Sequence, residues 1–257
     1  MNPLRLKALV LTLALAICYE QPYADDKAWV YDEVLTKLHE IGGDIRAIRR
    51  ELVETKRAVQ ALQSERNSAV NIPSEVKLSG IPVLGSDSAE YAIVEISDFQ
   101  CPYCKRHYAN AFGKLNDNYI ATGKIRYAVL DYPLPFHEHA ESAAVAARCA
   151  SGQGKYWEVH GELFGGNDGI LGRSQYLEIA KKINLDIQEY ESCLDNEEIK
   201  HQVQASAKYS ESLGVRGTPA FFMGKISDGK ITNVKAFAGA QPYDRFVQVI
   251  DAMMKEN

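Results

Sequence analysis

Residues 92–104 read AIVEISDFQCPYC, and this stretch decides the fold. The run from Ala92 to Phe99 is nearly all apolar, which is typical of a strand buried on both faces of a sheet. After it, apolar side chains recur on one helical face, at Tyr108, Ala111, Phe112, Leu115 and Tyr119. The sequence therefore predicts a buried strand that passes into a helix, with two cysteines at the junction.

The two cysteines, Cys101 and Cys104, form a C-x-x-C pair at the predicted helix start. Unpaired N–H groups and the helix dipole favour an anion there, so the first sulfur more easily becomes a thiolate, the form that attacks disulfides. Pro102 suits the first turn because it needs no N–H partner. Cys104 lies one turn further along, within reach of Cys101. We therefore predict a redox-active disulfide pair.

A static disulfide and half of a metal site are the two alternatives for this pair. A copper or zinc carrier would use the same thiols, but the sequence has no second C-x-x-C and no H-x₃₋₅-H pair. We therefore favour redox catalysis and expect neither a metal nor a cofactor. The histidines nearest the pair, His107, His137 and His139, lack ligand spacing and are expected in surface or capping roles.

The rest of the chain after the pair alternates strand and helix patterns. In chain order the sequence predicts a strand at 125–132, a helix-rich block at about 137–213, a hairpin of strands at 220–225 and 231–237 around Asp228-Gly229, and a last helix from Pro242 to about Met254. This order predicts an α/β protein.

Four motifs carry a resemblance to a known family. They are SDFQCPYC at 97–104, RCA at 148–150, QGKYW at 153–157 and GTPAFF at 217–222. Together they resemble the DsbA-type thiol:disulfide oxidoreductases, a group of the thioredoxin superfamily with DsbG-like and ScsC-like members. The resemblance covers about residues 80–257. It implies a thioredoxin fold with an inserted helical domain, which agrees with the helix-rich block, and it implies exported protein substrates and a membrane redox partner.

The resemblance also implies roles for three residues beyond the cysteines. Pro219 would be a cis-proline facing the sulfurs, and the Thr218 backbone would pair with a bound substrate strand. Glu95 would accept a proton from Cys104 beneath the disulfide. From the residues alone, the alternatives are an ordinary trans-proline at a strand start and a glutamate that faces solvent.

Two departures from the strongest oxidases of this group affect the expected direction of exchange. Tyr103 stands where those oxidases have a histidine, so a cationic imidazole is missing beside the thiolate. The long N-terminal extension is absent from the monomeric oxidases, whereas related oligomeric members carry one and isomerise or reduce disulfides. We therefore expect an isomerase or a mixed oxidase and isomerase.

The N-terminus has the pattern of an export signal. Arg5 and Lys7 precede an apolar run from Ala8 to Ile17, interrupted only by Thr12, which predicts a signal peptide at 1–24 and a periplasmic protein. A lipid-anchored form through Cys18 and an uncleaved membrane anchor stay open.

Export to an oxidising compartment bears on the remaining cysteines. Cleavage at Ala24 would leave four, and an even number favours two disulfide pairs. Beside Cys101–Cys104 we therefore expect a structural disulfide Cys149–Cys193. The alternative is that both are buried free thiols.

A heptad repeat follows the predicted signal. The a and d positions are largely apolar: Tyr31, Leu38, Ile45, Leu52 and Val59 at a, and Val34, Ile41, Ile48, Thr55 and Leu62 at d. We expect a coiled-coil helix at 27–66 that forms a dimer or trimer through residues 31–62, with a weak point at Gly42-Gly43. The alternative is a long amphipathic helix folded back on the domain at 81–257, after a linker at 67–80.

Composition limits the function classes. The 257 residues are 46% hydrophobic and 25% charged, which is ordinary for a globular protein. The net charge of −5 argues against nucleic acid as a partner, because such binding needs a basic surface. The classes that remain are a disulfide oxidoreductase, a metal carrier, and a coiled-coil envelope protein without enzyme activity.

Overall fold

The computed structural model describes residues 28–68, 72–166 and 172–255. The predicted signal peptide and Cys18 lie outside these residues. The chain divides into two compact units, Met1–Gln63 and Ser64–Asn257.

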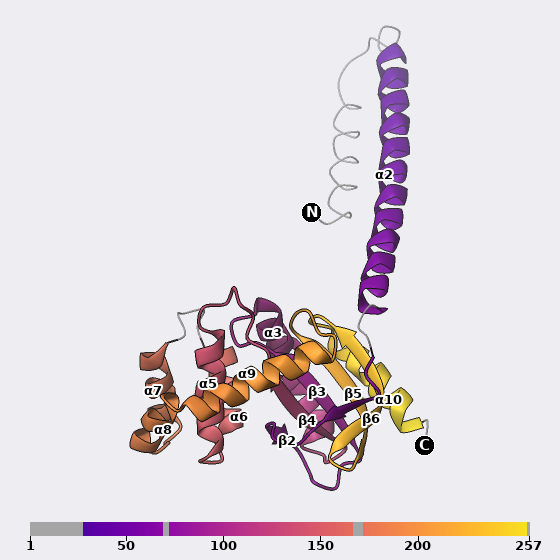
Figure 1. The fold of residues 1–257 in the computed structure, drawn as a ribbon. Helices are drawn as coiled ribbons and strands as arrows, with labels where there is room; N and C mark the ends of the chain where they lie inside the picture. Colours follow the sequence, from indigo (N-terminus) through magenta and orange to yellow (C-terminus); the bar gives the residue numbers. More distant parts are fainter. Residues whose placement is uncertain (1–27, 69–71, 167–171, 256–257) are drawn as a thin grey trace. The chain divides into compact units, whose positions relative to one another are not determined.

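The described part of the first unit lies in one helix, α2, which runs from Ala28 to Ser68, past the end of that unit, without a break at Gly42 or Gly43 (Figure 1). Helical hydrogen bonding therefore continues through the expected weak point. Every apolar a and d side chain of the repeat that the structure describes is exposed: Tyr31, Val34, Leu38, Ile41, Ile45, Ile48, Leu52 and Val59. The helix thus carries the predicted apolar stripe, and the side chains of this stripe are exposed to solvent.

The second unit is built on a mixed sheet of six strands. Their order is β1-β6-β5-β3-β4-β2. The strands are β1 Glu75–Lys77, β2 Val83–Leu84, β3 Tyr91–Ser97, β4 Ile125–Asp131, β5 Ala220–Ser227 and β6 Lys230–Ala238. Only β3 and β4 pair in parallel, as a strand–helix–strand crossover requires.

Strand β3 is the centre of this sheet, and all seven of its residues are buried. Ala92, Val94 and Ile96 pack into the core on one face, together with residues of α9 (Glu197–Ser212) and the segment after it. Tyr91 and Ile93 pack on the other face, against the helices at 102–120 and α10 (Tyr243–Lys255). Burial on both faces explains why the strand reads as a continuous apolar run.

The predicted hairpin between β5 and β6 is confirmed. Its turn is Asp228-Gly229, with φ of 50° and 73°. Positive φ at both turn residues matches the right-handed twist of the flanking strands, and aspartate and glycine tolerate it.

One part of the predicted linker is wrong. Residues Glu75–Lys77, assigned to the linker at 67–80, form β1 and pair with β6, and Val76 is fully buried. The sheet therefore begins before residue 81. Three residues with one apolar side chain are too short a pattern to reveal a strand.

Helices lie on both sides of the insertion point and pack around the sheet. They are α3 Pro102–His107, η1 Tyr108–Phe112, α4 Gly113–Leu115, η2 Asn116–Ile120, α5 Ala140–Ser151, α6 Tyr156–Gly165, α7 Arg173–Lys182, α8 Ile187–Leu194, α9 Glu197–Ser212 and α10 Tyr243–Lys255. Helices α5 to α8 gather to one side of the sheet, and α9 returns across it (Figure 1). This block lies between β4 and β5, so the helical insertion is confirmed.

A buried ion pair joins the insertion to the sheet. Arg148 of α5 donates from Nε to Oδ2 of Asp131, the last residue of β4, at 2.5 Å. A second donor of Arg148 reaches the carbonyl of Gly80 at 3.4 Å. The RCA motif thus holds α5 against the end of the sheet.

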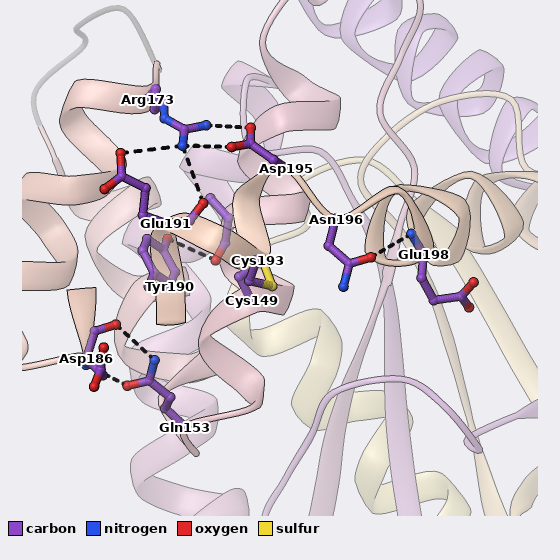
Figure 2. The surroundings of a disulfide bond; sticks show 11 residues. Cys149, Gln153, Arg173, Asp186, Tyr190, Glu191, Cys193, Asp195, Asn196 and Glu198 are labelled. Carbon is purple, nitrogen blue, oxygen red and sulfur yellow. Dashed lines mark hydrogen bonds and ion pairs between the residues drawn. A yellow bond between two sulfur atoms is a disulfide. The ribbon is translucent and has the colours of Figure 1, made fainter. Parts of the chain in front are cut away.

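A disulfide links two helices inside the insertion. The sulfurs of Cys149 on α5 and Cys193 on α8 are 2.08 Å apart (Figure 2). Close by, Arg173 at the start of α7 donates to Asp195 at 2.6 Å and to Glu191 at 3.5 Å. The bond and the ion pairs fasten α5, α7 and α8 together.

Replacing Cys149 and Cys193 together with alanine is expected to lower the free energy of unfolding by about 4 kcal/mol, because the bond closes a long loop in the unfolded chain. The cysteines are 44 residues apart. Urea unfolding followed by circular dichroism measures the change. A double variant as stable as the unaltered chain would show that the bond does not contribute.

Candidate active site

The C-x-x-C pair lies where β3 gives way to α3. Cys101 is the N-cap residue, with φ −70° and ψ 120°, and Pro102 occupies the first turn. Both cysteines are free thiols; Cys101 is 3% exposed and Cys104 fully buried. The strand fixes the position of the pair, and the helix start supplies the polar environment expected from the sequence.

The loop before β5 faces the first sulfur. The Thr218–Pro219 peptide bond is cis, and the Cys101 thiol donates to the Thr218 carbonyl oxygen at 3.4 Å. Residues 117 positions apart in the chain are therefore in contact at the site. The Thr218 hydroxyl is buried and has no hydrogen-bond partner in the structure.

The two thiols differ in acidity. Hydrogen bonding from Cys104 is the largest cause that lowers the pKa of Cys101, to about 6, against the effect of burial. Burial, together with its contacts to Cys101 and Glu95, raises the pKa of Cys104 well above its ordinary value. Cys101 is therefore the thiol that ionises more readily, and the thiolate is the form that reacts with disulfides.

Cys101 is expected to react with iodoacetamide faster than Cys104 at every pH from 5 to 8, with its rate rising around a midpoint near its pKa of about 6. The thiolate is the reactive form, so the rate follows its population. Peptide mapping after brief alkylation assigns the modified residue. Two cysteines that react equally, each with a midpoint at a pH of about 8.5, would contradict this difference in acidity.

Glu95 lies beneath the pair, within β3, and is 2% exposed. The structure therefore excludes the solvent-facing alternative. Tyr127 of β4 donates to one carboxylate oxygen at 2.7 Å, and Ser97 donates to the other at 2.9 Å. Burial raises the pKa of Glu95 to about 7, against the lowering effect of these two hydrogen bonds. A carboxyl group with this pKa can take up or release a proton at neutral pH.

Asp98 is a site residue that the sequence prediction missed. Its Oδ1 accepts from the backbone N–H of Gln100 at 2.7 Å, and its Oδ2 accepts from that of Leu134 at 2.8 Å. Its own carbonyl accepts from the N–H of Cys101 at 3.0 Å. Asp98 thereby shapes the turn that presents the cysteine. An acidic residue directly after a buried strand was the available signal.

The histidines do not all match their expected surface or capping roles. His107 is fully buried, its ring nitrogen Nε2 lies 2.9 Å from the Tyr127 hydroxyl, and burial lowers its pKa to about 3. The surface role expected for it is therefore wrong, because α3 turns this face toward the sheet. His137 contacts Asp98 at 2.7 Å, and His139 stands at the N-cap of α5 without a side-chain cap bond.

Within residues 28–68, 72–166 and 172–255, no cluster of three or more histidine, cysteine, aspartate or glutamate side chains has the arrangement of a metal site. None of the helices in the described part of the chain is long and apolar enough to cross a membrane.

Comparison with known proteins agrees with this geometry. The family model for Thioredoxin matches residues 78–252. Disulfide bond formation protein D of Bacillus subtilis is 24% identical over 204 residues, which are 74% of this chain and 83% of that protein. The crystal structure of α-DsbA1 of Wolbachia pipientis superposes with a TM-score of 0.63 at 22% identity, over 72% of this chain and 94% of that one.

Larger proteins also contain a similar region. A sodium/proton antiporter, NhaA 3 of Salinispora tropica, is 26% identical over 72% of this chain, but the match spans only 28% of that protein's length. The likeness is thus to one region of the antiporter. The match to the family model covers most of the chain, and the likeness to the Wolbachia structure shows the same fold. This chain therefore belongs to the thioredoxin family.

Proposed function

We propose that the protein is a DsbA-type thiol:disulfide oxidoreductase that exchanges disulfides with exported proteins in the periplasm. The observation that carries the proposal is the geometry of the pair: Cys101 caps the start of α3 beside the cis Thr218–Pro219 bond, and Cys104 is buried one turn behind it, which lowers the pKa of the first thiol and raises that of the second. A static disulfide has no need of this asymmetry, whereas exchange requires one thiolate nucleophile and one resolving thiol.

The exchange proceeds in two balanced steps. The Cys101 thiolate attacks a client disulfide, so a bond forms between Cys101 and one client sulfur while the other leaves as a thiolate. Cys104 then attacks Cys101, its proton passes to Glu95, and the second client sulfur leaves. The client disulfide is reduced and the Cys101–Cys104 disulfide is formed. The reverse sequence oxidises a client, and a membrane redox partner would restore the form that is consumed.

The surroundings of the pair suit an unfolded or misfolded protein as substrate. Tyr103 is 51% exposed and Phe136 is 77% exposed, and the ring of Phe136 packs edge-to-face against that of His137, which contacts Asp98. These rings offer apolar contacts to a client segment near the reactive sulfur. The Thr218 backbone beside Cys101 would pair with an extended client strand.

The α2 stripe supports an oligomeric isomerase. The exposed a and d side chains repeat over several turns, which is the pattern of a coiled-coil seam, and the occupant we propose is a second or third copy of this chain. In a parallel pairing, Asp44 would face Arg49 of the neighbouring copy, and Glu51 would face Lys56. Several active sites would then surround one client, as isomerisation of a misfolded protein favours.

The test is the action of the full chain on two forms of ribonuclease. We expect the chain to reactivate ribonuclease with scrambled disulfides, and the oxidised chain to form disulfides in reduced ribonuclease. Regain of ribonuclease activity measures both. A chain that does neither, and instead binds copper or zinc in proportion to its thiol pairs, would overturn the proposal in favour of a metal carrier.

A further inference from the structure

Four polar side chains form a continuous hydrogen-bonded row under the active site. His107 Nε2 lies 2.9 Å from the Tyr127 hydroxyl, which donates to Glu95 Oε2 at 2.7 Å; the Ser97 hydroxyl contacts Oε1 at 2.9 Å. All four residues are almost completely buried. The mechanism above uses Glu95 alone, so the other three have no assigned task.

The donors in this row have one consistent direction. The Tyr127 hydroxyl donates its only proton to Glu95, so its oxygen can accept a hydrogen bond from His107 but cannot donate one to it. His107 must therefore carry its proton on Nε2 and donate it to Tyr127, which leaves Nδ1 as the bare nitrogen; Nδ1 has no partner. Burial lowers the pKa of His107 to about 3, so the ring is neutral and supplies a single fixed donor toward Tyr127.

Hydrogen bonds donated in this direction, from His107 to Tyr127 and from Tyr127 to Glu95, favour the ionised form of Glu95. Each carboxylate oxygen accepts one hydroxyl, and a proton added to Oε2 would meet a Tyr127 hydroxyl that cannot turn away, because His107 already donates to its oxygen. The other titratable groups that face Glu95 are Cys101 at the N-cap of α3, Cys104 within α3 and Tyr156 on α6, and both thiolates disfavour the carboxylate. The hydrogen bonds of the row thus lower the proton affinity of Glu95, whereas burial and the neighbouring sulfurs raise it.

We propose that Tyr127, oriented by His107, and Ser97 are positioning residues that set the proton affinity of Glu95 and so the pH range in which Cys104 resolves a mixed disulfide. In this step the Cys104 proton moves to the carboxylate while the new sulfur–sulfur bond forms. A carboxyl group with weaker hydrogen bonds would be protonated at neutral pH and could not take that proton. This inference rests on the proposed disulfide exchange.

The experiment follows the reduced chain after mixing with 5,5′-dithiobis(2-nitrobenzoate), in a Cys18→Ser background that leaves Cys101 and Cys104 as the only free thiols. Attack by Cys101 releases one thionitrobenzoate, and attack by Cys104 on the mixed disulfide releases a second. The rate of the second release is measured by stopped-flow absorbance from pH 5 to 9.

In the Tyr127→Phe variant the pH midpoint of the second release is expected to rise by about one unit or more, since a hydrogen bond to a charged group is lost. At pH 6 this slows resolution by about tenfold. Ser97→Ala should shift the midpoint in the same direction, but by a smaller amount. In a Glu95→Gln background, neither substitution should move the pH profile further.

Tyr190→Phe is the matched control. Tyr190 is also fully buried, but its hydroxyl donates to the Ala146 carbonyl inside the insertion, at 3.0 Å. It should lower stability without moving the midpoint. If both site variants keep the midpoint of the unaltered chain, or shift it equally in the Glu95→Gln background, the inference is wrong. If the unaltered chain gives no second release at all, the proposed function itself fails.

Discussion

Replacing Cys101 with serine is expected to reduce disulfide exchange to the uncatalysed rate. A serine hydroxyl does not ionise near neutral pH and cannot attack a disulfide, whereas the thiol it replaces has a pKa lowered to about 6. The measurement is reactivation of scrambled ribonuclease by the variant and by the unaltered chain.

Two controls separate this loss from misfolding. The circular dichroism spectrum of Cys101→Ser should match that of the unaltered chain, because the serine occupies nearly the same volume at the N-cap of α3. A variant without the Cys149–Cys193 disulfide should keep its exchange activity, since that bond lies within the insertion. Residual exchange by Cys101→Ser at more than a small fraction of the original rate would place the chemistry elsewhere.

Deleting residues 25–70 is expected to turn an oligomer into a folded monomer that keeps thiol exchange and loses most isomerisation. The deletion stops short of β1, because Val76 is fully buried and belongs to the sheet. The active site lies wholly beyond it. Sedimentation velocity gives the oligomeric state, and the scrambled-ribonuclease assay gives the isomerisation rate.

A pair of point variants makes the same test without removing the helix. Leu52→Asp places a charge in the a position of the seam, and Val53→Asp places the same charge at the neighbouring b position; both native side chains are exposed. Only Leu52→Asp should dissociate the oligomer. A monomeric unaltered chain, or a truncated form that isomerises as well as the intact one, would contradict the account.

The parts of the fold that sequence reasoning predicted rest on local patterns. The buried strand β3 reads as an apolar run, the hairpin turn requires positive φ at Asp228-Gly229, and the C-x-x-C pair stands at a strand-to-helix junction. In each case the deciding residues lie within a few positions of one another. Local propensity and periodicity are enough to predict them.

The partners of Glu95 could not be predicted in this way. In the parallel pairing of β3 with β4, Ile93 lies opposite Tyr127, which puts the tyrosine on the same face as Glu95. A shift of one residue in this register would turn Tyr127 to the other face. His107 joins the row only because α3 packs on that face, so its burial depends on tertiary structure that no local pattern contains.

Asp98 shows the same limit on a smaller scale. Its position after β3 was visible in the sequence, but its bonds to Leu134 and His137 come from a loop that follows β4. Only the assembled sheet brings that loop to the active site. Long-range side-chain bonds of this kind are the main information that the structure adds.

The most direct test of disulfide exchange at Cys101 is mass mapping of the Cys104→Ala variant after incubation with scrambled ribonuclease. The second thiol is then missing, so the first intermediate should accumulate as a covalent complex whose only new linkage joins Cys101 to a client cysteine. Addition of dithiothreitol should cleave this linkage and release the two proteins as separate chains. Failure to trap any client, or a client linked through Cys149 or Cys193 instead, would contradict the account.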